Sequence, residues 1–400
     1  YHSRSPQYFL LVVSIMKILS VGIIASLLLL SGGVQSKGSE EQVKQSWADY
    51  FQRSKDHAQA YRTLLKQELG EKEEFEKPSK AKDFGLNMEQ PPAFYKTPEA
   101  ARLADIVISY QTPSGGWSKA VDMSKSKRRR GQGFSEKRKH YVATFDNDAT
   151  TTQLKFLAKV VTATGEKTYQ EAFLKGLDYI FDAQYPNGGW PQNYPVEGKY
   201  HDYITYNDKA MVSILDVVRD VAYAEESYRF VPQSYRKRAD QMLLRGVNCI
   251  LDTQLKAKGS IGGWAAQYHA FSLQPEIARA FEPDGIASQE SAEIALFLMS
   301  LQNPSPAVVQ AVDDVVTWFG KTRITGYRWE KGMLTPDTTA KPLWARFYEL
   351  DSDRPIFGDR DGKVYYSVAE ISKERREGYG WYKTSPAKVL KKHKKWRTSQ

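Results

Sequence analysis

The chain has 400 residues, of which 41% are hydrophobic, and its formal net charge is +10. A chain of this length and apolar content can bury a substantial core, and its positive charge favours a polyanionic partner. The one cysteine, Cys249, excludes an intramolecular disulfide framework. Because Cys249 lies on an apolar helical stripe, we expect it to be a buried hydrophobic residue.

The first 36 residues have the organisation of an export signal. Met16 and Lys17 precede the apolar run 18–30, which small residues follow. We therefore expect 1–36 to be an upstream extension plus a bacterial-type signal peptide, so that the mature protein is secreted or periplasmic. The alternative is an uncleaved membrane anchor over residues 8–30, which the charge of Lys17 disfavours.

Export also bears on the partner. Removal of residues 1–36 takes away two positive charges, Arg4 and Lys17, and lowers the net charge from +10 to +8. An acidic polysaccharide fits an exported basic protein better than nucleic acid does. We expect no nucleic-acid partner, no stable membrane association after signal cleavage, and a monomer.

Three segments follow the signal. Residues 37–92 combine helical periodicity over 40–69 with a charged connector, which predicts an N-terminal helix and a linker. Residues 93–384 form the predicted main domain, and residues 385–400 are a basic tail. The basic stretches 125–139 and 388–397 are either solvated surface or contacts for the polyanion.

The main domain repeats one unit three times. In each unit, an amphipathic helical run ends at a glutamine and is followed by a Gly-Gly-Trp triplet. The glutamines are Gln111, Gln184 and Gln254, and the triplets end at Trp117, Trp190 and Trp264. The tryptophans are 73 and 74 residues apart, a long period that implies long helices and loops. A weaker fourth unit is indicated by the run 308–319 followed by Trp329.

Two of the loops lead to a cluster of acidic and amide side chains that opens another helix. These clusters are Asp146-Asn147-Asp148 and Asn207-Asp208. Short acceptor side chains often cap helices, which is the simplest interpretation of each cluster alone. Two clusters at equivalent points of a repeat instead favour a functional role. Because helices alternate with long loops and strand signals are few, we predict an all-α chain of paired helices wound into a ring, with the loops at one rim.

Five separated motifs run in order through residues 95–382. They are Thr144–Thr150 (TFDNDAT), Tyr185–Gln192 (YPNGGWPQ), Ile204–Ala210 (ITYNDKA), Ala278–Glu282 (ARAFE), and Leu343–Glu349 (LWARFYE) with Arg354–Gly362 (RPIFGDRDG). In sequence and order they closely resemble the pectate lyases of polysaccharide lyase family 10. The chain departs from the family pattern in the basic insertion 124–140 and in its basic tail.

The resemblance implies a toroid or barrel of paired helices, of the (α/α)3 type, whose long loops form a groove for polygalacturonate. It also implies calcium (Ca2+) as cofactor and cleavage by elimination. By motif matching, the calcium ligands would be Asp146, Asn147 and Asp208, the catalytic base would be Arg279, and the substrate carboxylates would be bound by Arg346 and Arg360. Lys209 is a further substrate-binding candidate and the fallback base, and Trp117 and Trp190 are candidates for stacking on sugar rings.

The residue types suit this chemistry, with one difficulty. Positive charge beside the galacturonate carboxylate would stabilise the anion that forms when the neighbouring proton is removed. Calcium prefers the oxygen ligands that Asp146, Asn147 and Asp208 offer, and guanidinium groups bind carboxylates through two hydrogen bonds. Arginine, however, normally stays protonated, whereas a general base must be neutral. Arg279 is therefore assigned on the resemblance, and an alkaline optimum would favour it.

Each assignment has a structural alternative, and the function has two rivals. The aspartates could be helix caps, the arginines could form surface ion pairs, and the Gly-Gly-Trp loops could be packing corners alone. A glycoside hydrolase could use Asp146 with Asp208 or Glu282 as acid and base. The chain could also bind pectin without cutting it. Only elimination would leave an unsaturated, ultraviolet-absorbing sugar end.

Overall fold

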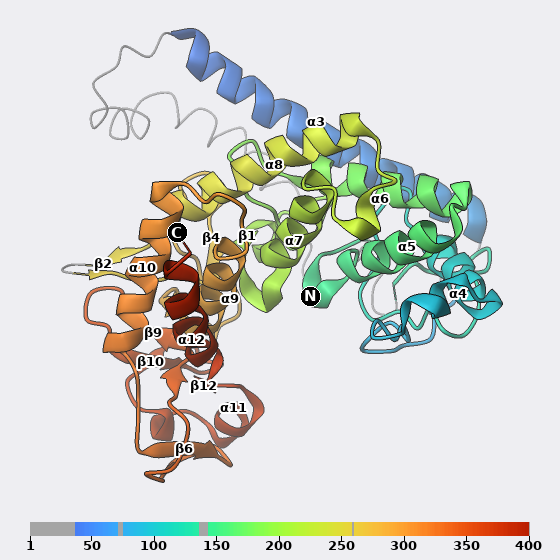
Figure 1. Cartoon of the computed structure of the whole chain (residues 1–400). Coiled ribbons are helices and arrows are strands. Elements are labelled where there is room, and N and C mark those ends of the chain that lie inside the picture. Colours follow the sequence, from blue (N-terminus) through green and yellow to red (C-terminus); the bar gives the residue numbers. More distant parts are fainter. Residues whose placement is uncertain (1–36, 71–74, 136–142, 258–259, 400) are drawn as a thin grey trace. The chain divides into compact units, whose positions relative to one another are not determined.

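The computed structural model of the protein describes residues 37–70, 75–135, 143–257 and 260–399 (Figure 1). The predicted signal peptide, over 1–36, lies outside the described residues. The chain divides into two compact units, residues 1–49 and 50–400. In the first unit, the described residues belong to the beginning of helix α3 (Lys37–Leu69), which covers the run 40–69 that has helical periodicity in the sequence.

The second unit starts within α3. Tyr50 packs against Tyr185, with 4.8 Å between ring centroids, and donates a hydrogen bond to the carbonyl of Ala183 at 3.3 Å. About three helical turns further on, Tyr61 packs on Phe134, with 5.8 Å between ring centroids. The C-terminal part of α3 is therefore an integral part of this unit, held by buried aromatic rings.

The unit is built mainly from helices, and they are arranged in pairs (Figure 1). Beside the short α11 (Lys373–Gly378), they are α4 (Pro98–Ser109), α5 (Thr151–Thr164), α6 (Lys167–Ala183), α7 (Ala210–Ala222), α8 (Gln233–Asp252), α9 (Ser288–Leu298), α10 (Pro306–Lys321) and α12 (Ser385–Arg397). α5 packs on α6, α7 on α8, and α9 on α12, while α5, α7 and α9 also contact one another in order. The predicted all-α class is confirmed; within the described ranges the helices do not form a barrel.

The strands are short and lie in the loops. The four-stranded sheet has the order β11-β10-β9-β5, and the two-stranded pairs are β1-β4, β8-β12, β2-β3 and β6-β7, all antiparallel. Their bounds are β1 Ile204–Thr205, β2 Lys256–Ala257, β3 Ser260–Ile261, β4 Gln267–Tyr268, β5 Ile286–Ala287, β6 Tyr327–Glu330, β7 Met333–Pro336, β8 Trp344–Ala345, β9 Phe347–Tyr348, β10 Pro355–Gly358, β11 Val364–Tyr365 and β12 Tyr382–Lys383. These ladders fix the loops that follow the helices.

In each of the three sequence repeats, the glutamine joins that repeat to the next one. The side-chain amide of Gln111 donates to the carbonyls of Gly115 in its own loop and Ala172 in α6, at 2.7 and 2.8 Å. The equivalent pairs of acceptors are Gly188 and Met242 for Gln184, and Gly262 and Ala311 for Gln254, all between 3.0 and 3.1 Å. One side chain thus closes its own turn and satisfies a carbonyl of the neighbouring helix, which explains its recurrence.

The tryptophans repeat in the same way, and they correct the predicted fourth unit. The indole N–H of Trp117 donates to the carbonyl of Val107, that of Trp190 to Ile180, and that of Trp264 to Ile250, at 2.7 to 2.9 Å. The fourth equivalent is Trp344, which donates to Phe319 at 2.9 Å. Trp329 instead lies in β6, so its assignment to the fourth unit was wrong.

The glycine that opens the first two triplets is required by close approach. Gly115 and Gly188 have φ of 102° and 93°, and a Cβ on them would lie 2.4 and 2.1 Å from the carbonyl oxygens of Lys175 and Arg245. Any side chain would push the loop away from the neighbouring helix. The triplet is thus a device for packing a loop against the next unit.

Two further expectations concern the core and the tail. Cys249 is fully buried, as predicted. The basic tail forms α12, which packs against α9 and α10 through Val389 and Trp396. No helix in the described part of the chain combines the length and apolar content needed to cross a bilayer.

Candidate functional site

Two short helical turns bring the acidic clusters together. They are η2 (Asp146–Asp148) and η4 (Asn207–Lys209), which contact each other and precede α5 and α7. The middle residues, Asn147 and Asp208, both have a φ of 51°, a conformation that Asn and Asp adopt more readily than other residues. Neither α5 nor α7 has a side-chain cap at its N-cap residue. Helix capping therefore does not account for the clusters.

Asp146 is the buried member of the first cluster. Its side chain is 5% exposed and forms an ion pair with Lys119, and it accepts a hydrogen bond of 2.8 Å from the side-chain amide of Asn147. Asn147 is exposed. Lys119 was not predicted from the sequence, although a signal existed. It stands two residues after Trp117, as Arg346 stands two residues after Trp344.

Asp208 links the clusters electrostatically to the arginines. Burial raises the pKa of Asp208, and the charge of Asp146 raises it further, while Arg346 and Arg279 lower it. Three predicted residues from separate loops therefore act on the charge of Asp208. The two carboxylates repel each other, so a cation between them would relieve an unfavourable interaction.

Arg346 is held rigidly beneath the clusters. Its guanidinium donates to Glu290 at 2.6 Å and to the side-chain oxygen of Asn207 at 3.0 Å. Arg346 is 6% exposed and Glu290 is fully buried. Burial lowers the pKa of Arg346, but Glu290 and the other acidic groups around it together outweigh this effect and raise the pKa overall. Arg346 is thus a fixed positive charge beside Asp208.

Arg279 is also paired with a carboxylate. Its Nε donates to Glu282 at 2.6 Å, a second nitrogen completes the two-point contact, and the hydroxyl of Tyr379 donates to the same carboxylate at 2.8 Å. Burial lowers the pKa of Arg279, but the hydrogen bond and charge of Glu282 outweigh it, so the pKa is raised. This pair favours the protonated guanidinium.

The other two predicted cations are more exposed. Arg360 forms a two-point contact with Glu374 at 3.0 Å, and its guanidinium lies 5.9 Å from the ring of Phe281, which Arg279 also faces at 5.1 Å. Lys209 is exposed at the start of α7. Arg360 therefore neighbours Arg279, whereas Lys209 belongs to the second acidic cluster.

Glu293 and Lys383 are further charged groups near the site that sequence reasoning missed. Burial raises the pKa of Glu293 to about 7, and the charge of Glu290 adds to the effect. Burial and the charge of Arg346 lower the pKa of Lys383. Glu290 and Glu293 lie one helical turn apart at the start of α9, a spacing visible in the sequence. Only the packing of α9 against η4 shows that it points to the site.

The stacking role predicted for Trp117 and Trp190 is contradicted. Both side chains are fully buried, and their indole nitrogens bind backbone carbonyls. Their rings pack on helical glycines, since a Cβ on Gly176 or Gly246 would lie 3.0 Å from the ring of Trp117 or Trp190. A sugar cannot reach these faces, so the packing alternative is correct for both.

The residues predicted to bind calcium form a partial ligand set. Asp146 and Asp208 offer carboxylate oxygens, and the amide of Asn147 donates to Asp146, which leaves its own oxygen as an acceptor. In the described ranges, no group of three or more His, Cys, Asp or Glu side chains is placed to hold a metal ion. Calcium takes six to eight oxygen ligands. The set therefore fits calcium only if substrate and water supply the remaining oxygens.

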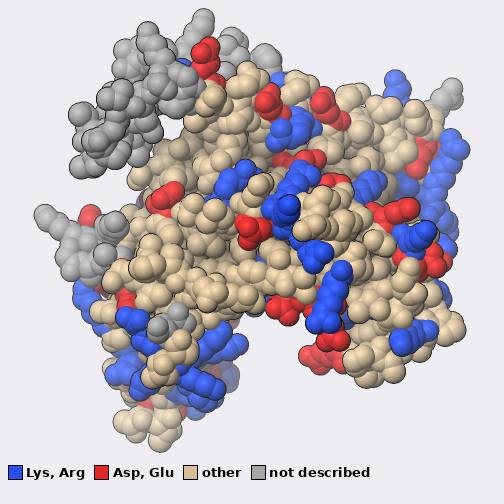
Figure 2. All heavy atoms as spheres, turned by 45° about the horizontal axis from the view of Figure 1, so that its top comes forward, with Lys and Arg blue, Asp and Glu red and all other residues tan. Residues whose placement is uncertain are grey.

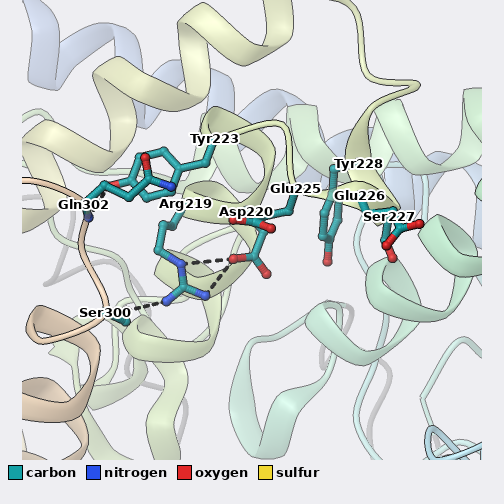
Figure 3. Close-up of a pocket in the computed structure, with 9 residues that line it drawn as sticks. All are labelled: Arg219, Asp220, Tyr223, Glu225, Glu226, Ser227, Tyr228, Ser300 and Gln302. Carbon is teal, nitrogen blue, oxygen red and sulfur yellow. Dashed lines mark hydrogen bonds and ion pairs between the residues drawn. The ribbon is translucent and has the colours of Figure 1, made fainter.

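A separate surface pocket of about 480 Å³ lies at the other end of α7 (Figure 3). Its lining includes Arg219, which points to Asp220 and Ser300 and binds them at 2.6 Å. α7 begins at η4, and a helix of its length spans about 20 Å. The pocket is therefore remote from the clusters, and its arginine is already paired. The predicted substrate groove stays a prediction.

The model of the family described as pectic acid lyase matches residues 111–390. The solved structure of a family 10 polysaccharide lyase from Cellvibrio cellulosa is similar, with 32% identity and a TM-score of 0.68, over 78% of this chain and 98% of that chain. A mutant of that lyase in complex with trigalacturonic acid has 31% identity and a TM-score of 0.68, over 79% and 99%. No curated protein matches this chain. The chain therefore belongs to the pectic acid lyases of polysaccharide lyase family 10, and it is a polysaccharide lyase.

Proposed function

We propose that this protein is a calcium-dependent pectate lyase that cleaves α-1,4-linked polygalacturonate by β-elimination and gives 4,5-unsaturated oligogalacturonates. The observation that carries the proposal is the electrostatic linkage of Asp208 with Asp146, Arg346 and Arg279. These residues come from separate loops of the repeat, and all four were assigned to this chemistry by their motifs. Chance surface charges would not be expected to converge in this way.

The substrate follows from charge and from the relatives. A mutant of the similar lyase from Cellvibrio cellulosa has been solved in complex with trigalacturonic acid. In this chain, Arg346 and Arg360 are the groups proposed to bind the carboxylates of neighbouring sugar units, because a guanidinium offers two parallel donors to a carboxylate. Arg346 would act from a fixed position, since Glu290 and Asn207 hold it. Arg360 would bind a second sugar carboxylate from the exposed surface near Arg279.

The reaction breaks two bonds and forms a double bond. A base takes the proton from C5, the C4–O4 bond breaks, a C4–C5 double bond forms, and the leaving oxygen takes a proton from solvent. Negative charge develops on the carboxylate attached to C5. The fixed charge of Arg346 stabilises that charge more than the ground state, which is the requirement for acceleration.

Arg279 is the proposed base. Its pair with Glu282 raises its pKa, so the neutral form becomes available only as the pH rises. The proposal therefore includes an alkaline optimum. Lys209, in the second acidic cluster, remains the fallback base.

Asp146, Asn147 and Asp208 are the residues proposed to hold calcium. When bound, the ion would supply positive charge beside the substrate carboxylate and lower the cost of the anion. Asp146 and Asp208 repel each other in its absence, which favours cation binding. The proposed location is the cell exterior or periplasm, as an export signal would require.

The direct test is to incubate the mature protein with polygalacturonate at alkaline pH, with calcium or with a chelator, and to record both unsaturated product and new reducing ends. We expect ultraviolet-absorbing product with calcium and almost none with chelator. New reducing ends without the chromophore would establish hydrolysis instead. Binding without any new ends would establish a pectin-binding protein.

A further inference from the structure

The C-terminal helix α12 presents an unusual concentration of positive charge. Between Ser385 and Arg397 it exposes Lys388, Lys391, Lys392, Lys394, Lys395 and Arg397. Figure 2 shows Lys and Arg side chains gathered in the region where α11 and α12 lie. The helix is not a loose tail, because Val389 and Trp396 are buried against the rest of the fold. The charges are therefore held on a rigid support.

Few acids neutralise this helix. Asp313 of α10 accepts from His393 at 2.7 Å and pairs with Arg397 at 3.2 Å. In the described part of the chain, the ammonium groups of Lys388, Lys391, Lys394 and Lys395 have neither a hydrogen bond nor an ion pair. We call these four residues the α12 lysines. Their charge is free to act on a partner.

The pKa of Lys392 reflects the positive electrostatic potential around α12. Burial lowers its pKa, and the charges of Lys388 and Arg219 lower it further. Asp216 is an acid that raises the pKa of Lys392, but it is itself paired with Arg219 at 2.7 Å. Repulsion among like charges therefore persists around α12. Such an arrangement costs stability in the free protein and favours binding of a polyanion.

The other basic segment of the chain behaves differently. In residues 125–130, Lys127 pairs with Asp105 at 2.8 Å, and Arg128 and Arg129 pair with Glu68 and Glu76. Three of the five cations in this segment are thus paired with acids, and the pair of Arg128 with Glu68 fastens α3 to the main domain. Sequence charge alone did not separate these two segments, but their partners do.

α12 also starts beside the candidate site. Lys383 ends β12, which pairs with β8 next to Arg346, and α12 begins two residues later. The helix then extends for about 20 Å. The family match ends at residue 390, so most of the exposed charge of α12 lies beyond it. A bound polymer could thus contact both the site and the helix.

We propose that the α12 lysines form a non-catalytic docking surface that holds polygalacturonate beside the site. This inference rests on the proposed function, because it names the same polymer as the ligand. A short oligomer bound at the site would not reach along the helix, whereas a long polyanion would contact both. The surface should therefore strengthen binding of polymer and leave the reaction of a trimer unchanged. Salt should weaken it, since exposed charges are screened.

The test uses the variant K388Q/K391Q/K394Q/K395Q. Lysine and glutamine have similar helix propensities, so α12 should stay folded. The control K96Q/K167Q/K237Q/K341Q removes the same charge from exposed lysines elsewhere. Affinity for immobilised polygalacturonate is measured with chelator present, and turnover of trigalacturonic acid is measured separately with calcium. We expect the α12 variant to bind polymer about tenfold more weakly than wild type, and the control and the trimer turnover to be unchanged.

Equal polymer binding by wild type and the α12 variant would overturn the proposal. An equal loss in the control would overturn it too, because net charge would then be the cause. Stronger wild-type binding to vesicles of anionic phospholipid than to polymer, lost in the α12 variant, would assign the surface to a membrane instead. Failure of the proposed lyase function would appear as absent product from wild type, and the binding comparison would still be decisive.

Discussion

The candidate site and α12 use positive charge in opposite ways. At the site, Lys119, Arg279 and Arg346 are each paired with a carboxylate. On α12, the four lysines defined above have no such partner in the described structure. Both regions are suited to an anionic polymer, yet only the first fixes where each charge lies.

The difference separates positioning from attraction. A paired, buried guanidinium is held in one orientation, so it can stabilise charge at a defined atom. Unpaired ammonium groups on an exposed helix create a field that attracts a polyanion without fixing its register. Changes at the site should therefore be large and specific to the reaction, whereas changes on α12 should be small and specific to long substrates.

The largest effect is expected at Arg279. If it is the base, Arg279→Ala should lower kcat by about 10³-fold and leave polymer affinity unchanged, because proton transfer is lost but the other charges remain. The matched control is Arg354→Ala, which removes an arginine that also covers an aromatic ring, 3.9 Å from Tyr366. Turnover of Arg279→Ala within tenfold of wild type would return the role of base to Lys209.

A second test concerns the cost of burying the carboxylate of Glu293 beside that of Glu290. The pKa of Glu293 is about 7 in the folded chain and 4.5 ordinarily. Between these values the unfolded chain releases a proton that the folded chain keeps. The free energy of unfolding should therefore fall by about 3 kcal/mol as the pH rises from 4.5 to 7, and stay level above 7. Urea unfolding of wild type and Glu293→Gln across this range isolates the effect, because the variant should lack it. A parallel pH dependence in both proteins would contradict the buried carboxylate.

Calcium use should depend on Asp208 more than on Asp148, an aspartate of the other acidic cluster. Asp208→Asn removes a proposed ligand charge and should raise the calcium concentration for half-maximal activity by at least about tenfold. Asp148→Asn is the control, since Asp148 is exposed and accepts a hydrogen bond of 2.5 Å from Ser213. Calcium titrations that shift equally in both variants would remove Asp208 from the ligand set.

The pairing of Arg279 with Glu282 should set the pH profile. Glu282→Gln removes the charge that raises the pKa of Arg279, so neutral Arg279 should become available at lower pH. We expect the rising limb of kcat/KM to move down by about one pH unit. Glu374→Gln breaks the more exposed pair with Arg360 and should not move the limb. An unchanged profile for Glu282→Gln would show that Arg279 does not titrate in the reaction.

The smallest of these effects is expected of the α12 variant, which should lose about tenfold in affinity for polymer and nothing in turnover of the trimer.

Much of the architecture was predictable because it depends on local pattern. Helical periodicity, the recurring glutamine and the Gly-Gly-Trp triplets predicted paired helices in repeated units. The fourth unit was misplaced at Trp329 because Trp344 lacks the glycine pair that marks the others. The role of Trp117 and Trp190 was open because an aromatic residue after glycines suits both packing and sugar stacking. Their burial against Gly176 and Gly246 decided it.

The site was predictable in part, through its motifs. Asp146, Asp208, Arg279 and Arg346 were named from sequence, and the fold brings their charges together. Lys119, Glu282, Glu290 and Glu293 acquire their roles only through contacts between segments far apart in the chain. Sequence shows which ionisable groups exist, but not which acid neutralises which base.

By itself, the sequence determined the helical class, the repeat, the family and the motif residues, because each depends on short-range pattern or spacing. Only the tertiary structure decided that the tryptophans are internal and that Arg279 and Arg346 are paired. It also decided that most of the cations in 125–130 pair with acids, whereas the α12 lysines do not. The reason is physical, since burial and charge pairing arise when distant segments pack together. Residues 125–130 and α12 are both basic in sequence, but the first contacts α3 through ion pairs and the second exposes unpaired lysines.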